Sequence, residues 1–478
     1  MTKQLNATNF NKPTRPTKIM QFGEGNFLRA FVDWIIQDLN DKNIINSGVV
    51  VVQPVPMGRV ADLACQDGLY TLCLEGIDKG QKVQTRQIID VLNDFVNPYE
   101  YYEKFLSYAR SSDLEVIVSN TTEAGIVLDA NDVDFSRCPN SFPGKLLSFL
   151  YERYFFFKGD MTKGLAIIPC ELIDHNGHAL QKVLNELAQI RNMDEQFIHW
   201  LNNANHFTDT LVDRIVPGYP RDTVEQIWQD TGFVDNNVVK GEVFHLWVLK
   251  KDEFIQSKLP ADQSGLNVIF ADDIVPYKQR KVKILNGAHT AMVPVAYLCG
   301  VDTVGEALAD KQISTFIRQL IFEEIKPTIA LPEDQMQAFA ESVLERFQNP
   351  FVRHELMSIA LNSTTKFKTR LLPSYNDHIA KFGTVPNRIL FAFAALVTFQ
   401  KGVRGDETIA IKDDQQYLDF WAELWTLNDM TEIAKKALGN VSIWEQNLAT
   451  EHNVKVVAEF LQDINTNGMR KALAKVIA

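Results

Sequence analysis

Residues 18–30, KIMQFGEGNFLRA, decide how this chain begins to fold. The first five residues predict a short strand, and the glycines at positions 23 and 25 predict a tight turn after it. From Phe27 onward, apolar residues recur at the 3.6-residue period of a helix. The run GVVVVQ at residues 48–53 is typical of a strand buried in a parallel sheet. These segments predict a strand–helix–strand unit of the kind that forms half of a nucleotide-binding domain.

The glycine turn lies where such a unit binds a dinucleotide. The backbone at the turn can approach a pyrophosphate, and the first N–H groups of the following helix can bind it. Two features depart from the usual pattern, because Leu28 replaces the third glycine and Gln53 replaces the acidic residue that binds the ribose hydroxyls. We expect an adenine dinucleotide, and these residues leave NAD and NADP both open. The candidate cofactor-binding residues are Phe22, Gly23, Gly25, Asn26, Phe27, Arg29, Gln53, Asn120 and Thr121.

Two later strands run into polar loops. The apolar run at residues 114–118 leads into the loop 119–125, and the run at 165–168 leads into a loop that contains Asn176 and Gly177. Ligands of open parallel sheets bind outside the carboxyl ends of the strands, so we expect both loops to line a binding cleft. An ordinary turn is an equally good interpretation of the Asn-Gly pair. The segment 208–221 is expected to be a turn-rich connector, and 241–248 and 266–270 to be the last strands.

The pattern of the sequence changes after residue 272, where strand-like runs nearly vanish. We therefore predict an α/β fold class with two domains: a Rossmann-like, doubly wound N-terminal domain at residues 1–271 and an all-α C-terminal domain at residues 272–478. The segments with helical periodicity are 304–325, 334–347, 387–399, 415–427, 430–438 and 454–464.

The nonapeptide KVKILNGAH at residues 281–289 carries the candidate chemistry. In a regular helix, at about 100° per residue, Asn286 lies roughly 140° from Lys281 and His289 roughly 80°, so that the three side chains share one sector. An amine, a carboxamide and an imidazole on one face can transfer a proton and stabilise an oxyanion. The alternative is a basic helix start whose Asn286 and His289 are hydrogen-bonded polar residues of the core.

Composition limits the classes of partner. A formal net charge of -12 argues against nucleic acid, and the polar N-terminus and short apolar runs argue against a membrane. The five cysteines form no CxxC pair, which suits reduced thiols. The spacing His175-x-x-His178 has no partner cluster elsewhere in the chain. We expect a cytoplasmic protein without a metal site.

The segment 362–373 places three cations at alternate positions, Lys366, Lys368 and Arg370. This spacing favours an extended segment with one cationic face. A solvated loop is the simpler interpretation, and a clamp for a substrate carboxylate is the functional one, since a planar guanidinium fits a carboxylate.

Several of these motifs together resemble one family. The patterns Gly23-x-Gly25-x-Phe27-x-Arg29-Ala30 and Lys281-x4-Asn286-x2-His289 are similar to the polyol-specific long-chain dehydrogenases, the mannitol dehydrogenase family. The resemblance covers nearly the whole chain. Residues 21–34 and 284–292 are most similar to the tagaturonate reductase branch, because Leu28 and Phe31 flank the motif arginine where mannitol and fructuronate enzymes usually carry a histidine.

The resemblance implies a metal-independent, NAD(H)-dependent reduction of D-tagaturonate to D-altronate in hexuronate catabolism. It implies that Lys281 is the general acid/base, that Asn286 and Asn176 stabilise the alkoxide, and that His289 binds a substrate hydroxyl. The uronate carboxylate gives Arg370, and after it Lys368 and Lys366, a binding role. A fructuronate reductase, a mannitol-type polyol dehydrogenase and a nucleotide-binding protein without catalysis are the alternatives. The sequence leaves a monomer and a small homo-oligomer both open.

Overall fold

The computed structural model describes residues 2–121 and 125–478 and divides the chain into two compact units. Unit 1 comprises Met1–Gly76 and Lys82–Ile274, and unit 2 comprises Ile77–Gln81 and Val275–Ala478. The main division falls after residue 274, close to the one expected after residue 271. The predicted polar loop 119–125 includes residues 122–124, which lie outside the described residues.

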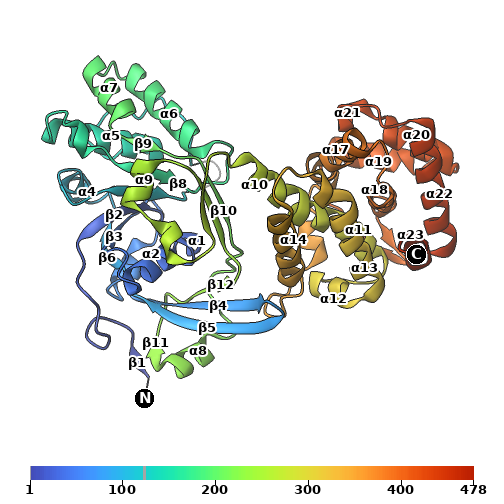
Figure 1. Cartoon of the computed structure of the whole chain (residues 1–478), viewed down its shortest axis with the longest axis horizontal. Coiled ribbons are helices and arrows are strands. Elements are labelled where there is room, and N and C mark those ends of the chain that lie inside the picture. Colours follow the sequence, from blue (N-terminus) through green and yellow to red (C-terminus); the bar gives the residue numbers. More distant parts are fainter. Residues whose placement is uncertain (1, 122–124) are drawn as a thin grey trace. The chain divides into compact units, whose positions relative to one another are not determined.

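A six-stranded sheet forms the centre of unit 1 (Figure 1). Its strand order is β6-β3-β2-β7-β8-β9, and every neighbouring pair is parallel. Counted from its first strand, this is the order 3-2-1-4-5-6 of a doubly wound Rossmann sheet, which confirms the predicted fold class. The strands are β2 (Thr17–Phe22), β3 (Gly48–Val52), β6 (Leu92–Val96), β7 (Val116–Ser119), β8 (Ala166–Pro169) and β9 (His206–Phe207).

The strands are buried on both faces, and alternate residues enter two separate cores. Val49 and Val51 of β3 pack toward α2 (Val32–Asp41) and α9 (Glu253–Lys258). Val50 and Val52 pack toward the core of the opposite face. The helices of that face are α4 (Tyr102–Ala109), α5 (Phe142–Phe156), α6 (Asn176–Ile190) and α7 (Glu195–Asn203). Burial on both sides explains the unbroken valine run of β3.

Smaller sheets extend unit 1. The predicted strand 241–248 is wrong as one element, because it divides into two strands of different sheets. The predicted connector 208–221 contains a strand, β10, that pairs with β13. The three smaller sheets comprise β10 (Thr210–Asp213), β13 (Leu246–Lys250) and β14 (Val268–Ala271); β12 (Val239–Glu242), β4 (Tyr70–Asp78) and β5 (Gln81–Ile89); and β1 (Lys3–Gln4) and β11 (Phe233–Val234). The remaining helices of unit 1 are α1 (Asn26–Arg29), α3 (Val60–Ala64) and α8 (Val224–Thr231).

Unit 2 is built mainly of helices around the apolar helix α18 (Asn387–Phe399), whose bounds agree with the prediction. The predicted helix 304–325 is interrupted at Asp310, whose side chain caps a new helix. Other helices of unit 2 are α11 (Gly287–Leu298), α12 (Val304–Ala309), α13 (Lys311–Gln319), α14 (Glu333–Phe347), α17 (Leu372–Phe382), α19 (Gln415–Leu424), α20 (Met430–Gly439), α22 (Glu451–Asn467) and α23 (Met469–Val476). In the described part of the chain, no helix combines the length and apolar character that a bilayer crossing needs.

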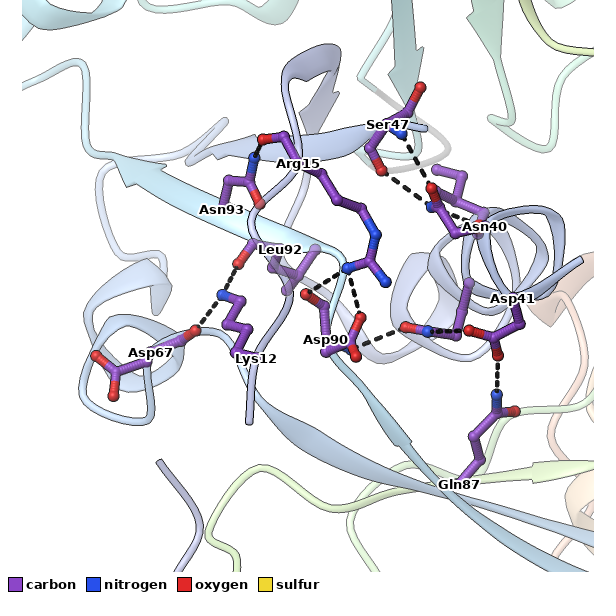
Figure 2. Close-up of polar contacts among 12 residues, drawn as sticks. Lys12, Arg15, Asn40, Asp41, Ser47, Asp67, Gln87, Asp90, Leu92 and Asn93 are labelled. Carbon is purple, nitrogen blue, oxygen red and sulfur yellow. Dashed lines mark hydrogen bonds and ion pairs between the residues drawn. The ribbon is translucent and has the colours of Figure 1, made fainter. Parts of the chain in front are cut away.

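An N-terminal strap, residues 5–16, is attached to unit 1 by two basic side chains (Figure 2). Lys12 Nζ donates to the main-chain oxygens of Asp67 and Leu92. Arg15 pairs with Asp90 at 2.6 Å, and both side chains are at most one-tenth exposed. The amide of Asp90 is in turn bound by Gln37 of α2 at 2.9 Å. These contacts therefore join the strap to the amino end of β6 in the central sheet and to helix α2, which covers one face of that sheet.

Replacing Arg15 by methionine tests this attachment. The substitution leaves the buried Asp90 carboxylate without its charge partner, so we expect the free energy of unfolding of unit 1 to fall by about 3 kcal/mol. Urea unfolding followed by fluorescence measures the change. Lys182→Met, which removes an exposed pair with Glu186, is the control and should change the value by less than about 0.5 kcal/mol. Equal effects of the two substitutions would contradict the prediction.

Candidate functional site

The glycine turn after β2 fits a ligand that needs close backbone approach. Gly23 has φ of +121°, and a β-carbon there would lie 3.0 Å from the main-chain oxygen of Asn120. Gly25 is exposed, and a β-carbon there would meet nothing within 4 Å. Helix α1 begins at Asn26, so the N–H groups of its first residues have no hydrogen-bond acceptor within the helix. The turn thus has the open cradle that a phosphate group requires.

The predicted helix after this turn is interrupted. Helix α1 ends at Arg29, and α2 starts only at Val32. Phe27 stacks on Phe31 with 5.0 Å between ring centroids, whereas Phe22 lies in the core between the rings of Phe105 and Phe142. Phe22 and Phe27 therefore support the turn by packing against neighbouring aromatic rings.

The loop after β7 lies beside the glycine turn and is held by a buried carboxylate. Glu171 accepts hydrogen bonds from Ser119 Oγ at 3.0 Å and from the main-chain N–H and hydroxyl of Thr121 at 3.0 and 3.1 Å. The side chain of Asn120 donates to Cys170 O at 2.6 Å. Burial raises the pKa of Glu171, and the hydrogen bonds oppose that rise. Sequence reasoning missed Glu171, although an acidic residue directly after a strand beside this loop was a usable signal.

A hollow of about 670 Å³ opens next to the turn. It is lined by Gly25, Asn26 and Arg29 from the turn and by Arg59 and Asp62 from the segment after β3. Arg59 Nε pairs with Asp62 at 2.6 Å. The rest of its lining consists of Glu24, Leu63, Pro217, Tyr219, Arg221, Asn236 and Asn237. The hollow lies at the carboxyl ends of β2 and β3, where such folds bind ligands.

The side chains of two predicted cofactor residues form hydrogen bonds within the protein itself. Arg29 donates to Asn237 O and to Asn26 Oδ1, both at 2.7 Å, and to Glu24 O at 3.2 Å. Gln53 is buried, and its amide donates to Val55 O and Pro56 O in its own loop. Both side chains fix the backbone around the hollow, which makes them supports of the site.

Asn176 lies in unit 1 at the start of α6 and is fully buried. Its amide nitrogen is within 3.3 Å of the oxygens of Pro169, Glu171 and Thr210, and its oxygen accepts from the N–H groups of Gly177 and Thr210. Because donors and acceptors are both used, the side chain ties the loop after β8 to β10. This arrangement speaks for a structural role.

Asp33 lies on α2 below the glycine turn and has no exposed surface. Tyr70 OH lies 3.2 Å from Asp33 Oδ2 and 2.8 Å from Arg29 O, while Asp33 Oδ1 has no partner among the described residues. Burial raises the pKa of Asp33 to about 7, and the hydrogen bonds of Tyr70 and Gln21 limit the rise. The carboxyl group is therefore partly protonated near neutral pH.

In unit 2, the stretch Lys281–Asn286 forms a π-helix, η3, between α10 (Val275–Arg280) and α11. The expectation of a regular helix is wrong for these six residues. With i→i+5 hydrogen bonds the chain turns less per residue, so Asn286 points closer to the direction of Lys281 than a regular helix would allow. Lys281 and Asn286 are half-buried, whereas Ile284 and Leu285 face the core. Such π-turns occur frequently at functional sites.

His289 is buried in unit 2, and its Nε2 has no hydrogen-bond partner among the described residues. Its ring stacks on Phe347 at 4.2 Å and meets the edge of His354 at 5.3 Å. Burial, together with the charges of His354, Arg346, Arg370 and Lys366, holds the pKa of His289 well below its usual range. The imidazole is neutral and has an unused nitrogen. Sequence spacing gave no signal for Phe347, His354 or Arg346, which come from a different helix and loop.

The cationic segment is a helix, α16 (Ser363–Arg370), so the expected extended conformation is wrong. Lys366 and Arg370 are four positions apart, which puts both on one helix face, while Lys368 points elsewhere and pairs with Glu445 at 2.7 Å. A β-carbon on Gly287 would lie 3.4 Å from Arg370 O, which shows how closely α16 packs against the start of α11. The helix therefore brings Lys366 and Arg370, but not Lys368, toward His289.

Two basic side chains beside Lys281, those of Arg280 and Lys283, pack against other residues of unit 2. Lys283 is buried and pairs with Asp377 at 2.5 Å. The guanidinium of Arg280 lies over the rings of Tyr277 and Phe339, at 5.2 and 4.2 Å from their centroids. Within residues 2–121 and 125–478, no group of three His, Cys, Asp or Glu side chains is arranged to hold a metal ion.

Fold and glycine turn together define a protein of the Rossmann class with an added helical unit. The chain belongs to the mannitol dehydrogenase family, since it matches the mannitol dehydrogenase Rossmann domain over residues 17–263 and the mannitol dehydrogenase C-terminal domain over residues 273–466. It is an oxidoreductase that acts on CH–OH groups.

Curated relatives cover almost the whole chain. An altronate oxidoreductase of Yersinia pestis is 43% identical over 477 residues, with 98% of this chain and 99% of the relative covered. One of Escherichia coli O6:K15:H31 is 44% identical over 479 residues, again with 98% and 99% covered.

Two solved structures share the fold at 21% identity. The Pseudomonas fluorescens mannitol 2-dehydrogenase ternary complex with NAD and D-mannitol has a TM-score of 0.70, with 99% of each chain covered. A D-sorbitol dehydrogenase in substrate-free form has a TM-score of 0.84, with 99% of this chain and 100% of the other covered.

Replacing Asp33 by asparagine tests the state of this carboxyl group. Because its pKa is raised on folding, stability is lost as pH rises from the unfolded value of about 4 to the folded value. Relative to the native protein, Asp33→Asn should gain about 2–3 kcal/mol of unfolding free energy between pH 5 and pH 8. Urea titrations across this range measure it, with Asp41→Asn on the exposed side of α2 as control. A constant difference between variant and native protein would contradict the prediction.

Proposed function

We propose that the chain is an NAD(H)-dependent reductase of a keto-hexuronate, which converts D-tagaturonate to D-altronate. Identity of 43–44% to altronate oxidoreductases over nearly the full chain supports this substrate class. The observation that carries the proposal is the neutral, buried imidazole of His289, whose Nε2 lacks a partner among the described residues and which lies near the cations Lys366 and Arg370. A hydroxylated anion is the ligand that this combination suits.

The residues of the glycine turn fit a nicotinamide dinucleotide. Gly25 leaves room for the pyrophosphate, Gly23 permits the tight turn beside Asn120, and the first N–H groups of α1 would bind the pyrophosphate. When bound, the nicotinamide ring supplies the hydride for the carbonyl carbon. NAD(H) is proposed because the Pseudomonas fluorescens mannitol 2-dehydrogenase, which shares the fold, was solved with NAD. The hollow is lined by both acidic residues (Glu24 and Asp62) and basic residues (Arg29, Arg59 and Arg221), so its charges leave NADP(H) as the alternative.

Lys281, Asn286 and His289 have distinct roles in this proposal. Hydride addition builds negative charge on the carbonyl oxygen, and Lys281 Nζ would give that oxygen its proton. The carboxamide of Asn286 would donate a hydrogen bond to the same oxygen, which lowers the barrier. His289 Nε2 would bind a neighbouring hydroxyl, because an unpaired buried nitrogen costs free energy that a hydroxyl offsets. Asn176 would support the loop after β8 and would not donate to the alkoxide.

The uronate carboxylate would be bound by the half-buried face of α16 that carries Lys366 and Arg370. Arg370 and Lys366 share that face, and Lys366 Nζ already donates to Ile359 O at 2.7 Å. Arg370 remains the first candidate because its planar fork can bind both carboxylate oxygens. Lys368 becomes a weak candidate, since it pairs with Glu445.

Following NADH absorbance with a panel of substrates tests the reaction. We expect rapid oxidation with D-tagaturonate and slower turnover with D-fructuronate, D-fructose or NADPH. Lys281→Met should lower kcat by about 100-fold or more, because the proton donor is lost. Lys311→Met, an exposed lysine of unit 2, is the control. Faster turnover of fructuronate or fructose would favour the alternative members of the family, and turnover of none would remove the catalytic proposal.

Two positions of one helix test the carboxylate clamp. Arg370→Met should raise KM for D-tagaturonate about 10-fold or more and leave KM for NADH unchanged, because a charge-assisted pair is lost. Lys368→Met is the matched control, two residues away, and should change KM by less than about 2-fold. An unchanged uronate KM in Arg370→Met would show that other residues bind the carboxylate.

A further inference from the structure

Lys145, in the first turn of α5, is completely buried. Its Nζ donates to Tyr99 OH at 2.8 Å and to the main-chain oxygens of Asn140 and Ser141 at 2.7 and 3.4 Å. Among the described residues, no carboxylate lies within ion-pair distance of Nζ. A buried ammonium without a counter-ion is costly, and such groups are retained where they do a specific task. Burial lowers the pKa of Lys145 to about 8, because the buried position disfavours the charged form.

Tyr99 transmits this anchoring to the loop after β3. Its hydroxyl receives the hydrogen bond of Lys145 and lies 3.1 Å from Pro54 O, to which it donates. The ammonium also lies over the Tyr99 ring, at 4.6 Å from its centroid. Asp132 holds the backbone below, accepting from the N–H groups of Asn140 and Ser141 at 2.7 Å each. The three segments form one polar network around the buried ammonium of Lys145.

The loop Gln53–Arg59 is the element that this network holds on one side. On the other side, Glu24 of the glycine turn accepts from Arg59 N at 2.8 Å. Between these two points, Met57 and Val55 are 91% and 44% exposed. The loop ends at the hollow beside Gly25 and Arg29. In a Rossmann fold, the carboxyl end of this second strand binds the adenosine ribose.

We propose that Lys145 and Tyr99 are positioning residues that hold the loop Gln53–Arg59 for the adenosine half of the nicotinamide dinucleotide. This inference rests on the cofactor named in the proposed function. Neither side chain lines the hollow, so both act through Pro54. The exposed side chains of Val55 and Met57 would then cover the adenine ring, which explains apolar surface at the tip of an otherwise anchored loop.

Arg153 provides a matched control on the same helix. It is also buried, and its hydrogen bonds in the described structure go to the main-chain oxygens of Ala109, Ser111, Leu114 and Lys163. Leu114 precedes β7 in the chain, so Arg153 anchors the amino end of the sheet, whereas Lys145 anchors loops at its carboxyl end. Substitution of either Lys145 or Arg153 should lower stability, but only substitution of Lys145 should weaken cofactor binding.

Titration of the full chain with NADH, followed by fluorescence without any sugar, tests the proposal. Lys145→Met should raise Kd for NADH about 5- to 10-fold, and Lys145→Arg should restore part of the affinity. Tyr99→Phe removes only the hydroxyl and should raise Kd about 3-fold or more, even if Lys145→Met does not fold. Arg153→Met should lower Tm and leave Kd within about 2-fold. KM for the sugar at saturating NADH should not change in the folded variants.

The outcomes separate this inference from the proposed function. Unchanged Kd in both Lys145→Met and Tyr99→Phe would overturn the positioning role, as would an equal rise in Arg153→Met. Turnover of a sugar other than tagaturonate leaves the titration intact and affects only the substrate proposal. If the native protein bound no NADH, both proposals would fall.

Discussion

The close approach of Gly23 to the main-chain oxygen of Asn120 is the constraint on which the nucleotide-binding edge depends. It joins the loops after β2 and β7, the two strands at which the order of the sheet reverses. A side chain at position 23 would push the loops apart and would also be strained at φ of +121°. Glu171 supports the contact from the next strand by binding Ser119 and Thr121. The glycine is therefore a structural requirement before it is a cofactor contact.

A different constraint shapes the candidate site of unit 2. The π-helix at Lys281–Asn286 and the packing of α16 against Gly287 place one neutral imidazole beside several cations. Burial, together with these positive charges, keeps His289 uncharged, so its unpaired nitrogen can form a hydrogen bond with a hydroxyl. The same positive surroundings favour an anionic substrate. One arrangement thus explains both the state of the histidine and the kind of ligand that suits it.

The sequence predicted the large elements because their signals are local. The valines of β3, the glycines at 23 and 25 and the apolar period of α18 each indicate their structure without long-range information. It misjudged segments whose structure depends on distant partners. Lys366, Lys368 and Arg370 alternate as in a strand, yet the segment is helical because Phe367 and its neighbours pack against α18 and α11. The short strand β10 was missed because its register is set by β13.

Motif residues differ in what their side chains do, and the sequence does not separate them. Gly25 faces open space, and His289 keeps an unused nitrogen within the described structure. Arg29, Gln53 and Asn176 instead bind main-chain oxygens, although each belongs to a pattern that predicted a ligand contact. A buried polar side chain that holds a loop must be retained as strictly as one that touches a ligand, because either loss leaves backbone groups unpaired or misplaced. Hydrogen-bond saturation therefore distinguishes supporting residues from binding residues where a motif alone cannot.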